Sequence, residues 1–149
     1  MAYSATLIGG LHSNDYRGLA FLECTEDRNI NAKEIYEEFR ENQRRNLRGR
    51  FDLWLDGGHN DLYFHGFPSY RQYKECFMFK LREKRTHHRF YGFLIHPRPA
   101  NPRFQACALV SHGRKNEEHT DFTELDRINA LRVMPEVTQA VESAFSELE

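Results

Sequence analysis

Alternation of apolar and polar residues is clearest in the second half of the chain, where three stretches have the character of β-strands. They cover residues 76–83, 88–96 and 103–112. A proline-rich connection at 97–102 separates the last two stretches, and proline is poorly tolerated inside a β-ladder. We therefore expect three consecutive antiparallel strands.

Helical spacing of apolar residues predicts helices on both sides of these strands. Residues 31–58 begin at Asn31, a favoured N-cap residue type, and end at two glycines, so they form one long helix or two short ones. A further helix starts at Thr120 or Asp121 and runs to about residue 133. Pro135 then opens a last helix, because proline is favoured in the first helical turn.

Two segments carry weaker signals. The short apolar run at 17–24 could be a strand, whereas residues 57–75 read as a loop because glycine and proline interrupt them. At 149 residues the chain has the size of one domain. The expected fold class is α+β, with N-terminal helices packed on a small antiparallel sheet and additional C-terminal helices. The single domain spans 1–149.

Side chains two residues apart in a strand point to the same face. In the first strand the apolar face, which should pack on the helices, holds Phe77, Phe79 and Leu81. The other face presents Lys80 and Arg82 about 7 Å apart, since a strand rises ~3.4 Å per residue, and neighbouring phosphates have a comparable spacing. The next strand places Arg89 and Tyr91 together, so this face could bind a phosphate and stack a base.

The net charge of −1 hides an uneven distribution. Residues 80–115 contain nine lysines and arginines, four histidines and a single acid, Glu83, whereas residues 116–149 contain nine acids and two arginines. A second basic cluster at 40–50 has five arginines. One part of the molecule therefore suits a polyanion.

Each of these features also has a plain structural interpretation. Cations on an exposed sheet face are often a solvated surface, the pair His87–His88 is usually only a turn, and Tyr91 is more often a core aromatic. No spacing typical of a metal site accompanies the histidines, so we expect no metal and no cofactor. Three widely separated cysteines are expected to be reduced thiols in or near the core. The joint occurrence of the cations, the histidines and the aromatic residues within 80–115 nevertheless favours a nucleic-acid site.

No apolar run approaches the ~20 residues of a membrane span, and the N-terminus has no signal-peptide pattern. We therefore expect a cytoplasmic protein without a membrane partner.

Several short motifs in this region resemble the RelE/ParE toxin superfamily, particularly its phage-derived HigB-like branch. They are the lysine–leucine–arginine run at 80–82, the arginine and aromatics at 89–91, the strand ending His112-Gly113, and E-L-D-R-x-x-x-L-R at 124–132. The resemblance runs from about residue 32 to 133. Residues 1–30 form an N-terminal extension outside it, and 134–149 form an extra C-terminal helix.

The resemblance implies a RelE-like fold and the toxin of a type II toxin–antitoxin pair, which cuts messenger RNA on the ribosome without a metal. The implied partners are mRNA on the ribosome and an antitoxin, of helix-turn-helix type, encoded nearby. By position, Arg82 and Arg89 match phosphate-binding arginines and Lys80 matches a catalytic lysine. Arg114 or Lys115 matches the basic residue after the last strand.

Attack by the RNA 2′-OH needs a base, cations for the extra phosphate charge and an acid for the leaving 5′ oxygen. Lys80, Arg82 and Arg89 could supply the cations. The candidate proton carriers are His87, His88, His112 and His119, because histidine titrates near neutrality. The further candidates for RNA binding are Tyr91, Arg85, Arg114 and Lys115.

Two other functions remain open at this point. A noncatalytic descendant that binds RNA, the ribosome or a partner protein is favoured by Met78, where RelE-type members tend to carry a lysine, and by the acidic C-terminal segment. A gyrase-directed, ParE-like toxin is the third possibility. The clustered cations and histidines disfavour it, because they suit phosphodiester chemistry better than binding to gyrase.

Overall fold

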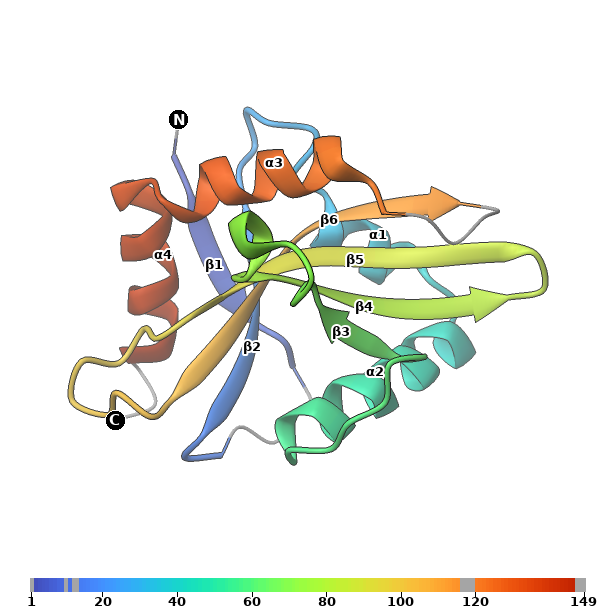
Figure 1. The fold of residues 1–149 in the computed structure, drawn as a ribbon, viewed down its shortest axis with the longest axis horizontal. Helices are drawn as coiled ribbons and strands as arrows, with labels where there is room; N and C mark the ends of the chain where they lie inside the picture. Colours follow the sequence, from blue (N-terminus) through green and yellow to red (C-terminus); the bar gives the residue numbers. More distant parts are fainter. Residues whose placement is uncertain (1, 10, 12–13, 116–119, 147–149) are drawn as a thin grey trace.

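The structure is a computed structural model that describes residues 2–9, 11, 14–115 and 120–146, with Lys115 described by its backbone alone. Within these residues it is an α+β fold of four α-helices and one six-stranded sheet (Figure 1). The helices are α1 (Ala32–Glu38), α2 (Glu41–Leu55), α3 (Phe122–Arg132) and α4 (Pro135–Ser146). The strands are β1 (Ser4–Leu7), β2 (Arg17–Glu23), β3 (Phe64–Gly66), β4 (Cys76–Glu83), β5 (Thr86–Ile95) and β6 (Gln105–Lys115).

The sheet is mixed, with the strand order β1-β2-β6-β5-β4-β3. All neighbours are antiparallel except β2 and β6, which run parallel with Leu19 opposite Cys107. The prediction of an antiparallel sheet is therefore correct for β4, β5 and β6 and wrong for the sheet as a whole. A parallel pair needs a long crossover, and here the crossover contains α1, α2 and three strands, which a local pattern does not reveal.

Helices cover both faces of the sheet (Figure 1). The aromatic residues of α1 and α2 pack against the face that holds Phe77, Phe79 and Leu81, as predicted. The opposite face, which holds Cys76, Met78, Tyr91 and Phe93, is covered by α3 over β4 and β5 and by α4 over β1 and β2. The second face is thus a core as well, and it changes to polar side chains only from Lys80 toward the end of the β4–β5 hairpin.

The helices and the middle strands follow the sequence predictions closely. The segment 31–58 forms two helices, because Phe39 and Arg40 adopt extended backbone conformations between α1 and α2. Asp121 caps α3 by accepting a hydrogen bond from the Glu124 amide. Asn31 precedes α1 without a side-chain cap, and its Oδ1 accepts a bond from the His112 amide of β6, 2.9 Å away.

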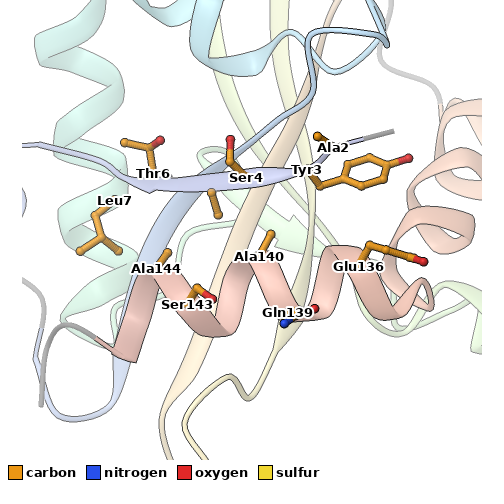
Figure 2. A pocket seen from close by; sticks show the side chains of 11 residues that line it. Ala2, Tyr3, Ser4, Thr6, Leu7, Glu136, Gln139, Ala140, Ser143 and Ala144 are labelled. Carbon is orange, nitrogen blue, oxygen red and sulfur yellow. The ribbon is translucent and has the colours of Figure 1, made fainter.

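Strands β1 and β3 were not predicted. Each is short, four and three residues respectively, and lies at an edge of the sheet, so neither shows a sustained alternation. Figure 2 shows β1 running alongside α4, with Ala140 and Ala144 of the helix turned toward the strand. The pocket between them has a volume of about 740 Å³, and Glu136 is the one charged side chain in its lining among the described residues.

Among the residues described, no helix combines the length and the apolar character needed to cross a membrane.

Candidate functional site

The β4–β5 hairpin sets the geometry of the site by its register. Lys80 lies opposite Arg89, Arg82 opposite His87, and Met78 opposite Tyr91. The hairpin closes between Glu83 and Thr86 through Lys84, whose φ of 52° lies in the left-handed region that a tight hairpin turn requires. Side chains of one face pair across the strands, so this register brings Lys80 and Arg89 together on the face covered further along by α3.

Lys80 and Arg89 line a pocket of about 190 Å³ between β3, β4, β5 and the start of α3. The other lining residues are His65, Phe67, Met78, Tyr91, Thr120 and Asp121. Arg89 is only 4% exposed, whereas Lys80 is half-buried. The pocket thus combines two cationic groups with an imidazole, a phenol and one carboxylate.

His65 of β3 is a member of this pocket that the sequence reasoning missed. Its Nδ1 lies 2.7 Å from the Gly66 carbonyl oxygen, which can only accept, so Nδ1 carries the proton in the neutral ring. Burial lowers the pKa of His65, and the nearby cations Lys80 and Arg89 lower it further against the opposing effect of the Gly66 carbonyl. The ring is therefore neutral at pH 7, with the Nε2 lone pair available as a base.

Tyr91 places a phenol at the floor of the same pocket. The ring is 2% exposed, and its hydroxyl makes no well-aligned hydrogen bond to a described residue. Burial raises the pKa of Tyr91, and the adjacent Arg89 opposes this effect only in part. The hydroxyl therefore stays protonated at neutral pH, as a hydrogen-bond donor for a ligand in the pocket.

A second polar cluster lies on the opposite face of the sheet. His88 Nδ1 is 3.0 Å from His112 Nε2, and His88 Nε2 is 3.3 Å from Glu83 Oε1. Glu83 also binds Arg40, at 3.1 Å, and Gln43. Both imidazole rings contact the edge-on ring of Phe39 at the end of α1. The cluster belongs to the side of the sheet that α1 and α2 cover.

Burial keeps these two histidines neutral. The pKa of His112 is lowered to about 4, mainly by burial and further by His88 and Arg114. The pKa of His88 is also lowered by burial, although the Glu83 carboxylate works in the opposite direction. Both rings are therefore uncharged at pH 7.

The structure divides the predicted catalytic residues between these two places. Lys80, Arg89 and Tyr91 line the pocket, and Arg82, His88, His112 and Arg114 line a groove of about 780 Å³ on the other face. The expectation that Arg82 and the histidines of this segment lie beside Lys80 and Arg89 therefore needs correction for Arg82, His88 and His112. Arg82 lies near the hairpin turn and lines the groove. His88 and His112 follow the opposite alternation, since His88 adjoins Arg89 in β5 and His112 pairs with Phe90.

The remaining predicted residues contribute less to either place. His87 is 9% exposed and lies opposite Arg82, and Arg85 is exposed at the tip of the hairpin. Neither lines the pocket or the groove. His119 and the side chain of Lys115 lie outside the described residues.

The cysteines are free and buried, as expected from the sequence. Burial raises the pKa of Cys76 to about 11, and it raises the pKa of Cys107 further, so both thiols are protonated. No group of three or more His, Cys, Asp or Glu side chains that could hold a metal ion occurs in the described part of the chain.

Comparison of the chain with protein-family models, with curated proteins and with solved structures finds no match.

Proposed function

We propose that the chain is a ribonuclease that binds a phosphate of RNA in the Lys80–Arg89 pocket and cleaves the strand by attack of the 2′-OH. The observation that carries the proposal is the cross-strand pair Lys80–Arg89 together with a neutral His65 in one small pocket. Two cations beside an uncharged imidazole fit the demands of a transesterification in which negative charge develops on a phosphate.

Each group has a defined role in this mechanism. His65 Nε2 takes the proton from the 2′-OH, since Nδ1 is held by the Gly66 carbonyl. Lys80 and Arg89 stabilise the additional charge on the phosphate oxygens. Tyr91, protonated because it is buried, gives its proton to the leaving 5′ oxygen, which departs as the 5′-hydroxyl end, and regains a proton from solvent after the products leave.

The resemblance to the RelE/ParE superfamily supports the same pocket. Lys80 and Arg89 are the residues that match its catalytic lysine and one phosphate-binding arginine. Two helices followed by β4, β5, β6 and α3 also fit the expected RelE-like arrangement, with β1, β2, β3 and α4 as additions. On this basis we propose a toxin that acts on messenger RNA presented by the ribosome, with an antitoxin that binds over the basic face.

Dependence on the ribosome has a physical reason. A pocket of about 190 Å³ accommodates little more than one phosphate and its sugar. Correct placement of the 2′-OH then has to come from a strand that is already held in a fixed conformation, and such positioning contributes several kcal/mol, on the order of 7 or more, to a reaction.

The test is induced expression without a partner, followed by primer extension on translated messages and analysis of fragment ends. We expect growth arrest and cleaved messages. The upstream fragment should end in a 2′,3′-cyclic phosphate or a 3′-phosphate, and the downstream fragment should begin with a 5′-hydroxyl. Fragments with 5′-phosphate and 3′-hydroxyl ends would contradict the mechanism, because they require a water nucleophile. Normal growth with intact messages would contradict the proposal that the protein is a toxin.

A binding role without cleavage is the second candidate. The Asp121 carboxylate lines the same pocket as Lys80 and Arg89, which reduces its positive charge. Such a descendant would retain affinity for RNA. It would leave a programmed ribosome and its message uncut under single-turnover conditions, and this outcome separates it from the enzyme.

A further inference from the structure

The groove on the α1–α2 face is a second feature with an unusual set of side chains. It has a volume of about 780 Å³ and lies between the α1–α2 connection and the ends of β4, β5 and β6. Its cationic lining residues are Arg40, Arg82, Lys84 and Arg114, and its acids are Glu38 and Glu83. Glu83 is already bound by Arg40 and His88, so it offers little negative charge to a ligand.

Three of the four cations are not used by the fold. The side chains of Arg82, Lys84 and Arg114 are exposed and make no hydrogen bond or ion pair to another described residue. They belong to three different segments, β4, the hairpin turn and β6. Groups from separate segments that converge on one groove without partners suit an anionic ligand.

The hydrogen-bond chain behind these cations defines which atom faces such a ligand. Ionised Glu83 can only accept, so the neutral His88 donates through Nε2 and accepts at Nδ1. His112 must then donate through Nε2, which leaves its Nδ1 as a lone pair. No described residue binds that nitrogen, and the His112 side chain is half-buried in the lining of the groove.

We infer that this groove is a second binding site for phosphate groups, held by Arg82, Lys84 and Arg114, with His112 Nδ1 as a hydrogen-bonding group that takes up a proton when the anion binds. Phosphate groups are the shared chemistry of a free polyphosphate and of a nucleic-acid backbone. The site lies on the other face of the sheet from the Lys80–Arg89 pocket and does not depend on cleavage.

Proton uptake follows from the charges around His112. The charged and titratable groups that line the groove with it are Arg82, Glu83, Lys84 and His88 from the β4–β5 hairpin, Arg114 from β6, and Arg40 and Glu38 from the α1–α2 side. An added anion favours the charged imidazole over the neutral one. By linkage, a lower pH must then strengthen anion binding.

The experiment is a titration of the full chain, labelled with ¹⁵N, with two probes: inorganic pyrophosphate and a short single-stranded 2′-deoxy oligonucleotide. The oligonucleotide has no 2′-OH and cannot be cut by the proposed mechanism, so this test is independent of the ribonuclease. We expect the ring signals of His112 and His88 to move on binding. Response to pyrophosphate identifies a site for free phosphates, and response to the oligonucleotide alone identifies a backbone site.

The double substitution Arg82→Ala and Arg114→Ala should weaken binding of the responsive probe at least tenfold. Arg103→Ala is the matched control, because Arg103 is exposed just before the other end of β6. Lys80→Ala, in the other pocket, should also leave the response of His112 unchanged. Oligonucleotide affinity should rise as the pH falls from 7 toward 5, and His112→Gln should remove most of that rise.

Equal affinity in the double variant and the wild type would overturn the inference, as would signals of His112 that respond to neither probe. Loss of the response in Lys80→Ala would assign the binding to the other pocket. Thermal unfolding of each variant verifies that it is folded before its affinity is compared.

Discussion

Lys80 of β4 and Arg89 of β5 occupy directly opposite positions in the hairpin, two like charges at the mouth and the floor of one pocket. Opposed like charges destabilise a strand pair by some tenths of a kcal/mol, up to about 1 kcal/mol. A negative charge beside them reduces that cost, and the Asp121 carboxylate lines the same pocket. Because Arg89 is only 4% exposed, the pair does not belong to a solvated surface.

Replacing either cation should abolish most cleavage. We expect Lys80→Ala and Arg89→Met each to lower the single-turnover rate on programmed ribosomes at least 100-fold, since a donor to a developing anion contributes about 3 kcal/mol. Arg85→Ala, at the exposed hairpin tip, is the control of equal charge change. Near-wild-type rates in both pocket variants, with folded protein by near-UV circular dichroism, would place the chemistry elsewhere.

Activity should depend on pH through His65. Its pKa is lowered by burial, so as a base it is active above that pKa, and the rate should fall only as the solution becomes acidic. His65→Gln should reduce the rate roughly 100-fold and remove this acidic limb. His88→Gln and His112→Gln should keep the limb. If the loss of rate at acidic pH persists in His65→Gln and disappears in His88→Gln or His112→Gln, a different histidine is the base.

Two of the three strands that form the pocket, β4 and β5, could be predicted from the sequence, whereas β3 could not. Alternation correctly placed Arg89 with Tyr91, and it correctly placed Phe77, Phe79 and Leu81 in the core, but it grouped Lys80 with Arg82, which lines the groove instead. His65 was missed because its strand has only three residues, too few to show an alternation of apolar and polar positions. The strand is defined by its pairing with β4, which the local sequence does not reveal.

Alternation also places His88 and Arg89 on opposite faces of the sheet. The sequence-based prediction nevertheless assigned both to one site, because they are neighbours in the sequence. The distances between His88, His112 and Glu83 depend on the register between three strands, which no single segment encodes. The parallel pair of β2 and β6 was unpredictable for the same reason.

Acid should destabilise the fold through His112. The folded-state pKa of about 4 lies below the unfolded value near 6.5, so the unfolded chain binds more protons between these two values. The stability contributed by the neutral ring is complete above pH 6.5 and is lost as the pH falls toward 4. Between pH 7.5 and pH 5 this amounts to about 2 kcal/mol of unfolding free energy.

Urea unfolding at these two pH values measures the effect. His112→Gln should show a smaller loss between pH 7.5 and pH 5 than the wild type, whereas His59→Gln, at an exposed histidine, should show the same loss. An unchanged pH dependence in His112→Gln would mean that the ring is not held neutral in the folded protein.

Gly92 lies at the irregularity between β5 and β6, where Tyr91 pairs with Ser111 and Gly92 with Leu109. A Cβ on Gly92 would come within 2.2 Å of the Ala108 carbonyl oxygen. Gly92→Ala should therefore lower the free energy of unfolding by about 3 kcal/mol or more, because the backbone must move.

Gly49→Ala is the matched substitution. Gly49 lies within α2 with no atom near its potential Cβ, so alanine there should stabilise the protein by up to about 1 kcal/mol. Chemical denaturation of both variants provides the comparison. A Gly92→Ala protein as stable as the wild type would show that the bulge relaxes without cost.

The parallel neighbours β2 and β6 have a consequence for the order in which the protein can assemble. During synthesis β2, with the apolar run Leu19–Leu22, is complete by residue 23, yet its partner begins at residue 105. At 5–20 residues per second the strand therefore waits for several seconds, roughly 4 to 16, before it can pair. In that interval only β1 can cover one of its edges, so the nascent chain is most exposed to aggregation and to chaperones while the middle of the domain is still being made.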